Sequence, residues 1–267
     1  MSAHDADAIE EALSHALSNV GLPGLDADGK YARLVAGSSL LQHLCSPEDD
    51  ESGALTNRML LVLESQPLIN RGAYERLLSS TIDAYWQNEQ LHPADYLPIV
   101  LVNDIVRYWR TVLLNHESRL RKKRNTHSLS EAETIALRRY SSYKLRDPRC
   151  LSCFSALAYL LALTPTEPSH VSRTDVAEMV RLTPLERLEW LEQNPATPRD
   201  IITTLRDCYK RFLDRIGAGK TALTDALMND DEIVQAVSRE GKQFTESMFQ
   251  LVEALGGGRT LHRAIVV

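Results

Sequence analysis

The sequence predicts an all-α protein built as a multi-helix bundle. In almost every segment with a readable period, apolar residues recur at i, i+3, i+4 and i+7, which is typical of amphipathic helices. Residues that cap helices precede several of these segments. The apolar content of 43% and the charged content of 25% are ordinary for a folded globular chain and exclude disorder throughout.

The first half of the chain is expected to form five helices. Their apolar periods cover residues 9–20, 31–44, 59–64, 74–87 and 101–124. Gly21, Pro23 and Gly24 are expected to end the first helix, because glycine adopts the conformation that closes a helix and proline cannot continue one. The acidic stretch Ser46–Gly53 and the segment around Pro67 are expected to be loops.

The later helix starts carry capping chemistry. We predict three capping boxes: Ser130 with Glu133, Thr183 with Glu186, and Thr197 with Asp200. In each, the hydroxyl accepts a hydrogen bond from a free backbone amide of the first turn, and the acid three residues later accepts one from the backbone amide of the capping residue. Asp147 and Pro148 predict a fourth start, which would place Cys150 in the first turn of an apolar helix. The last residues, Thr260–Val267, are expected to form a strand or an irregular tail.

The chain can be divided into two helical subdomains. Residues 1–163 would form a core domain with an acidic N-terminus and a basic central helix, and residues 173–258 would form a C-terminal helical bundle. The predicted boundary, Thr164–Ser172, contains two prolines and lacks apolar periodicity. A single α-fold with a long surface loop fits the same pattern.

Charge is distributed unevenly along the chain. Residues Arg107–Arg149 hold twelve Lys/Arg against four Asp/Glu, a net charge of +8, although the whole chain carries −6. The first 55 residues hold ten acids and two bases. We therefore expect the basic region to meet phosphate or an acidic partner, and the acidic N-terminus to be a solvated helix face or a docking surface for that region.

The candidate ligand-binding residues lie in and after the central helix. They are Asn103, Arg107, Arg110, Arg121, Lys122, Lys123, Arg124 and Lys144. Arginine supplies planar donors for phosphate or carboxylate, and a dense cationic run attracts nucleic acid without sequence preference. The alternative is a solvated face, in which Asp104 and Arg107 form a surface pair and the last cations favour the helix dipole.

One spacing suggests catalysis. Arg110 and His116 match the loose Arg-x(4 to 6)-His pattern of HEPN-type ribonucleases, in which histidine moves protons and arginine stabilises phosphate charge. Arg121 and His127 match the same pattern, which shows how permissive it is in a basic helix. An RNA-cleaving enzyme with Arg110 and His116 is therefore an alternative hypothesis, and no other catalytic residue, metal or cofactor is predicted.

Two further motifs have structural explanations. Residues Gly217–Thr221 resemble the end of a phosphate-binding loop, but the position of its first glycine is Asp214 and a helix precedes it, so a glycine helix end and a new helix start are expected. Cys150 and Cys153 have the spacing of a redox pair without the α/β context, and we expect both to be buried structural cysteines.

The N-terminal segment and the longest apolar run indicate where the protein is located. The acidic segment Met1–Glu11 does not read as a signal peptide, and the apolar run Cys150–Leu163 is too short to span a bilayer of about 30 Å. We therefore expect a cytoplasmic protein without a membrane contact and with reduced cysteines. An oligomer is compatible with the pattern.

Three phrases resemble the helical region of bacterial nucleotidyltransferase-like and HEPN-MNT-associated proteins. They are MLLVLESQPL at Met59–Leu68, LVNDIVRYWR at Leu101–Arg110 and CFSA at Cys153–Ala156. In that group Asp-x-Asp metal ligands follow a Gly-Ser motif, and none follows Gly37 and Ser38 here. The resemblance implies a bacterial accessory module that binds a separately encoded nucleotidyltransferase, a nucleic acid or another phosphate-bearing partner, within a defence or toxin–antitoxin pair. It carries over no site residue.

The leading hypothesis is a non-catalytic helical binding or accessory protein that uses its basic surface. Its ligand would be a nucleic acid, a nucleotide or an acidic protein. The alternatives are the RNA-cleaving enzyme, which requires Arg110 and His116 to converge in a cleft, and a self-associating helical scaffold, which requires an exposed apolar seam.

Overall fold

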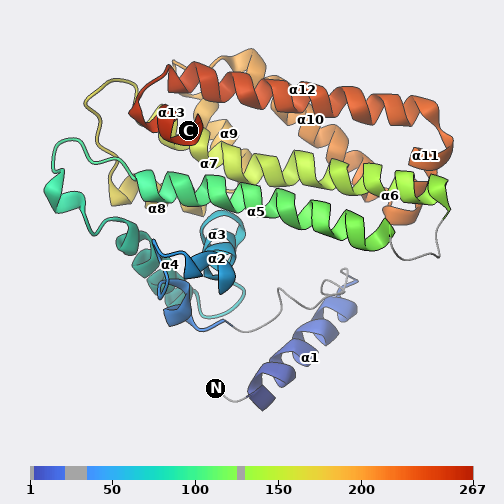
Figure 1. Ribbon diagram of the computed structural model, residues 1–267, viewed down its shortest axis with the longest axis horizontal. Helices are drawn as coiled ribbons and strands as arrows, with labels where there is room; N and C mark the ends of the chain where they lie inside the picture. Colours follow the sequence, from blue (N-terminus) through green and yellow to red (C-terminus); the bar gives the residue numbers. More distant parts are fainter. Residues whose placement is uncertain (1–2, 22–34, 125–129, 267) are drawn as a thin grey trace.

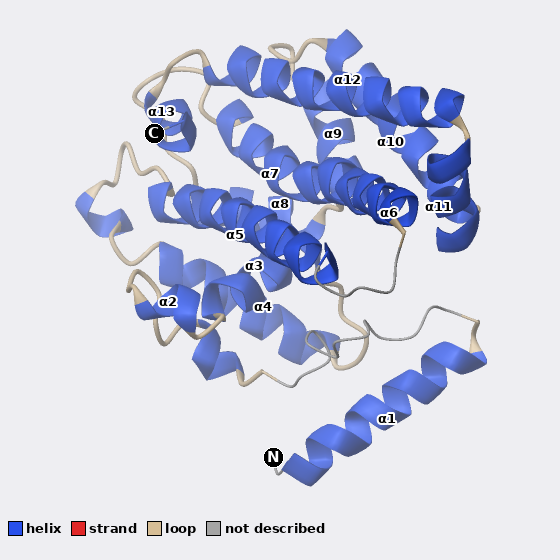
Figure 2. Ribbon diagram, turned by 45° about the vertical axis from the view of Figure 1, so that its right-hand side comes forward, coloured by secondary structure: helices blue, strands red, loops and turns tan. Residues whose placement is uncertain are grey.

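The computed structural model describes residues 3–21, 35–124 and 130–266, without the side chains of residues 3–6, 10 and 122–124. Every regular element in these ranges is helical, and Figure 2 shows the helices packed around one another. The predicted all-α, multi-helix fold is confirmed.

The first helix stands away from the others. α1 (Ala3–Asn19) is followed by a turn in which Gly21 has a φ of 69°, the left-handed conformation predicted for it. Figures 1 and 2 both show α1 separated from the packed helices. The apolar side chains of Ile9 on this helix and of Val20 in the turn after it are exposed.

The next elements run from the acidic stretch into the long central helix. They are α2 (Glu48–Glu51), α3 (Ala54–Glu64), α4 (Arg71–Tyr85) and α5 (Ile99–Arg124). The helix expected over residues 31–44 is wrong for its described part, which contains a short 3₁₀ helix at Gly37–Leu40 followed by turns. Cys45 closes this segment with a φ of 67°, a conformation that stops a helix at this point.

The helix start predicted at Asp147 and Pro148 is also wrong. α6 (Glu131–Lys144) continues through a π-helical segment, Leu145–Arg149, directly into α7 (Cys150–Ala162). Proline lacks an amide hydrogen and interrupts the hydrogen-bond ladder, and the wider π turn accommodates this interruption without ending the helix. Cys150 therefore lies inside a continuous helix and not in a first turn.

The C-terminal half contains six further helices. They are α8 (Arg173–Arg181), α9 (Pro184–Glu192), α10 (Arg199–Gly217), α11 (Lys220–Asn229), α12 (Asp231–Gly256) and α13 (Thr260–Val266). The helix end and restart predicted around Gly217–Thr221 are confirmed. The strand or tail expected at Thr260–Val267 is replaced by α13, whose Leu261 is buried in the core.

The capping predictions had mixed outcomes. Ser130 and Thr183 form complete capping boxes, as predicted. Thr197 does not cap α10, because Pro198 occupies the N-cap position and the Thr197 hydroxyl is buried without a hydrogen-bond partner. A further complete box, Ser172 with Asp175 at the start of α8, was not predicted.

α7 is the central element of the main core. Leu157 and Leu160 on this helix are fully buried, and α7 packs against α5, α9 and α12. The main core combines residues from both sides of Thr164–Ser172, from Leu55 to Leu261. A second, smaller apolar cluster joins α6, α10, α11 and α12.

Within the described ranges, no helix combines the length and apolar character needed to cross a membrane.

Candidate functional site

The predicted binding face of α5 is divided by the fold into two parts. Asn103 and Arg110 are exposed to solvent. Arg107 is engaged by carboxylates: it donates to Asp104 Oδ1 at 2.9 Å and to Asp50 Oδ2 at 2.9 Å. Because hydrogen bonds and charge already satisfy the Arg107 guanidinium, it is a poor candidate for capturing an external phosphate.

The expected surface pair of Asp104 and Arg107 is the edge of a buried ion cluster. Arg58 of α3 is fully buried and donates to Asp49 Oδ2 at 2.6 Å and to Asp104 Oδ2 at 2.7 Å. It also donates to the Tyr85 hydroxyl at 2.7 Å and to the Leu40 carbonyl oxygen at 2.8 Å. We call Arg58, Asp49, Asp104, Tyr85 and Arg107 the Arg58 cluster.

The Arg58 cluster is internally satisfied. Burial alone would lower the pKa of Arg58, but its hydrogen bond to Asp49, the nearby Tyr85 and its hydrogen bond to Asp104 together raise that pKa above its ordinary value. Burial is also the main cause that raises the pKa of Tyr85 well above its usual range. The cluster ties α2, α3, α4 and α5 together, so its groups are committed to the fold.

Other cations along α5 and α6 have no such partner. Arg110, Arg119 and Arg121 of α5 and Arg138 of α6 are exposed, and no carboxylate of the described residues lies within ion-pair distance of them. Lys144 is exposed as well and lies over the ring of Tyr140 at 5.7 Å. The predicted Lys122, Lys123 and Arg124 lie outside the described side chains.

Spacing places some of these cations on one side of α5. Arg110 and Arg121 are eleven residues apart, a rotation of about 20° around a helix of 3.6 residues per turn. Leu114 and Glu117 lie between them on the same side, and both are exposed. We call Arg110, Leu114, Glu117 and Arg121 the α5 stripe.

The candidate catalytic pair does not converge within one chain. Arg110 and His116 are six residues apart, which separates them by about 120° around the helix. Arg110 faces solvent, whereas His116 is half-buried against α6, with its Nε2 atom 3.4 Å from the Ser142 hydroxyl oxygen. His127, from the second match to the same pattern, lies outside the described residues.

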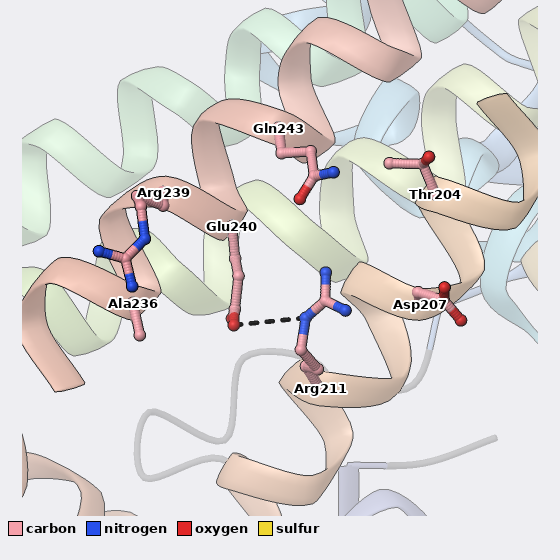
Figure 3. A pocket seen from close by; sticks show the side chains of 7 residues that line it. All are labelled: Thr204, Asp207, Arg211, Ala236, Arg239, Glu240 and Gln243. Atoms are coloured by element: carbon pink, nitrogen blue, oxygen red, sulfur yellow. Dashed lines mark ion pairs between the residues drawn. The ribbon is translucent and has the colours of Figure 1, made fainter. Parts of the chain in front are cut away.

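A polar groove lies between α10 and α12. Its cavity of about 470 Å³ is lined by Thr204, Asp207, Arg211, Ala236, Arg239, Glu240 and Gln243 (Figure 3). Glu240 lies 3.3 Å from Arg211 Nε and accepts a 2.9 Å hydrogen bond from Arg215. The two acids and two arginines of the lining balance one another, so the groove has no net preference for an anion or a cation.

The π segment contains a buried acid. Asp147 is fully buried, and its Oδ1 atom accepts from Arg146 at 3.3 Å while Oδ2 has no hydrogen-bond partner. Burial, opposed by Arg146, raises the pKa of Asp147 to about 6. Arg146 crosses α12 at Gly241, where a Cβ atom would overlap its guanidinium group, and donates to the Val237 carbonyl oxygen at 3.1 Å.

Cys150 and Cys153 are buried, as predicted. Burial raises the pKa of Cys150 to about 12 and that of Cys153 well above its usual range, so neither is a reactive thiolate near neutral pH. Among the described residues, no three His, Cys, Asp or Glu side chains form a group that could hold a metal ion.

The side chain with the most polar partners in this region, Arg58, could not be predicted from the sequence. Arg58 was not a candidate, because a lone arginine in an apolar period gives no sign that its partners come from positions 49, 85 and 104. Arg119 and Arg138 belong to the basic region and could have been included by charge alone. Comparison of the chain with protein-family models, with curated proteins and with solved structures gave no significant match.

Proposed function

We propose that the protein is a non-catalytic helical binding module that engages the phosphate backbone of a nucleic acid through cations along α5 and α6. The observation that supports this proposal is a contrast within one helix. Arg107 is neutralised by Asp104 and Asp50, whereas Arg110, Arg119 and Arg121, which follow it, are exposed without a carboxylate partner. An arginine that the fold does not use remains free to bind phosphate.

The expected binding mode is electrostatic. Phosphate contacts release counterions, so affinity falls steeply as salt rises, and such contacts read no sequence. Aromatic side chains suited to base stacking are few in this region: Tyr143 is buried and Tyr140 lies beneath Lys144. We therefore expect weak discrimination between sequences and strong dependence on ionic strength.

The test is a binding assay with one labelled single-stranded RNA and one labelled duplex DNA, in about 50 to 200 mM salt. Arg110→Gln combined with Arg121→Gln should weaken binding and lower the slope of log K against log salt by about 0.7 to 0.9 for each lost contact. Glu117→Lys, in the same α5 stripe, should strengthen binding, because it removes a negative charge and adds a positive one.

The matched control is Arg199→Gln combined with Lys220→Gln. These cations are exposed at the starts of α10 and α11, outside α5 and α6, and their removal changes the net charge by the same amount. Equal losses in the two double variants would show only a general effect of charge and would contradict the proposal. Cleavage of the RNA that disappears in both Arg110→Ala and His116→Ala would instead support the enzyme.

A bacterial accessory role with a separately encoded partner is part of this proposal only through the resemblance of Met59–Leu68, Leu101–Arg110 and Cys153–Ala156 to such proteins. Binding of neither nucleic acid, with an intact fold, would favour an acidic protein surface as the ligand of α5.

A further inference from the structure

α1 is an amphipathic helix whose apolar side is uncovered. Ile9, Leu13 and Leu17 recur with helical spacing, and Val20 continues the pattern in the turn after the helix. In the structure 48% of Ile9 and 69% of Val20 are exposed, and Leu13 and Leu17 are half-buried. A helix of 17 residues without a packing partner is marginal in water, because most helical stability in proteins comes from burying the apolar side. The helix therefore requires a surface that covers this side.

The charge of α1 defines that surface. Its sequence contains Asp5, Asp7, Glu10 and Glu11 and no lysine or arginine. An acidic amphipathic helix is complemented by a surface that combines exposed apolar groups with free cations. A purely apolar groove would leave these acids without a partner.

The C-terminal half of α5 offers this combination. On its exposed surface Leu114 is 71% exposed and Leu113 is 37% exposed. Arg110 lies one turn before these leucines, Arg121 lies about two turns after them, and neither has a carboxylate partner among the described residues. The same helix thus carries an uncovered apolar patch between two unpaired cations.

We infer that α1 docks within its own chain along the α5 stripe, with its apolar side on Leu113 and Leu114 and its acids beside Arg110 and Arg121. The lengths are compatible: 17 residues of α1 span about 25 Å, and the 13 residues between Gly21 and Val35 reach at most about 45 Å. A tethered helix also has a high effective concentration at its own chain, which favours docking in the same molecule over docking on a second copy.

Docking gives the stripe a second use. Since α1 would cover Arg110 and Arg121, it would compete with phosphate for the same cations. This competition rests on the proposed function. The docking itself does not depend on nucleic acid and can be measured without it. α1 would then act as an internal mimic of a polyanion that the true ligand must displace.

The experiment is hydrogen exchange of the α1 amides in the full chain. In the wild type these amides should be protected, and Leu114→Asp should lower their protection about tenfold or more, because it removes an apolar contact and places a like charge against the acids. The control is Phe249→Asp on α12, which replaces a 59% exposed apolar side chain elsewhere and should leave α1 protection unchanged. Unprotected α1 amides in the wild type, or equal effects of the two variants, would overturn the inference.

Two further variants separate the possible failures. Arg110→Glu with Arg121→Glu should release α1, and adding Asp7→Lys with Glu11→Lys should restore its protection by exchanging the charges. Protection that rises with protein concentration would place α1 on a second copy and overturn docking within the chain. Loss of nucleic-acid binding with α1 protection intact would contradict the proposed function and leave the docking standing.

Discussion

Among the arginines that the structure describes, two are completely buried, and the fold satisfies them by different chemistry. Arg58 of α3 is held by the carboxylates of Asp49 and Asp104. Arg187 of α9 is held by backbone carbonyl oxygens: it donates to those of Met179 at 3.0 Å, Ser152 at 3.3 Å and Leu63 at 3.4 Å. Arg58 is thus buried together with opposite charges, whereas Arg187 is buried as a single charge among carbonyl groups.

The pKa values move in opposite directions in the two regions. The carboxylates raise the pKa of Arg58 against the effect of burial, whereas burial lowers the pKa of Arg187 to about 10. Leu63 and Met179 lie near the C-terminal ends of α3 and α8, where carbonyl groups are free and the helix dipole favours a cation. Arg187 thus joins helix ends without requiring a buried acid, and it remains charged at neutral pH.

The largest expected effect is at the ion cluster. Arg58→Met should lower the free energy of unfolding by about 3 to 5 kcal/mol, because Asp49 and Asp104 would remain buried without their central partner. Urea unfolding followed by circular dichroism measures this loss. Arg58→Lys should also be destabilising, since an ammonium group cannot reproduce the forked hydrogen bonds. A loss below about 1 kcal/mol in Arg58→Met would show that water reaches the carboxylates.

A smaller loss is expected at the carbonyl-bound arginine. Arg187→Met should cost about 1 to 3 kcal/mol, because it leaves unsatisfied carbonyl groups but no unpaired charge. The same unfolding assay compares it directly with Arg58→Met. If Arg187→Met were as destabilising as Arg58→Met, the distinction between carboxylate and carbonyl partners would be wrong.

Asp147 tests the opposite case, a buried acid with incomplete pairing. Its folded pKa of about 6 lies above its ordinary value of 3.8, so the folded state binds more protons than the unfolded state between these values and stability falls as pH rises through them. Asp147→Asn should therefore raise the free energy of unfolding by about 1 to 3 kcal/mol at pH 8, and the gain should shrink towards pH 4. If the gain in the free energy of unfolding did not depend on pH, the ionisation of buried Asp147 would not be its cause.

The smallest effect on stability is expected where cations have no partner. Arg110→Gln and Arg121→Gln should each change the free energy of unfolding by less than about 0.5 kcal/mol, because both side chains are exposed and unpaired among the described residues. Arg107→Gln, one turn before Arg110, should cost more, because Asp104 and Asp50 lose a donor. Equal costs at positions 107 and 110 would remove the contrast on which the proposed function rests.

The sequence predicted elements better than it predicted their partners. The apolar period and the capping box at Ser130 identified α5 and α6, because both signals are local. The continuous path from α6 into α7 was missed, since a proline after an acid resembles a helix start and the π turn depends on tertiary packing.

The candidate site was predictable only in its exposed part. Arg110 and Arg121 were identified by charge alone and are exposed, as a binding surface requires. Arg107 was grouped with them, although three carboxylates surround it, two from α2 and one from its own helix. Spacing along a helix shows which residues share a side, but it does not show what the rest of the chain brings to that side.

The π segment Leu145–Arg149 sets the rotation of α6 relative to α7 about their common helix axis, and these helices belong to different apolar clusters. α6 contributes to the smaller cluster, where Tyr143 packs edge-on against Phe212 at 5.0 Å, and α7 forms the centre of the main core. A π turn accommodates one additional residue, so removing one residue here would turn α6 by about 100° relative to α7. Tyr143 would then point away from Phe212. The two clusters can therefore form together only with the helix rotation that this single turn provides.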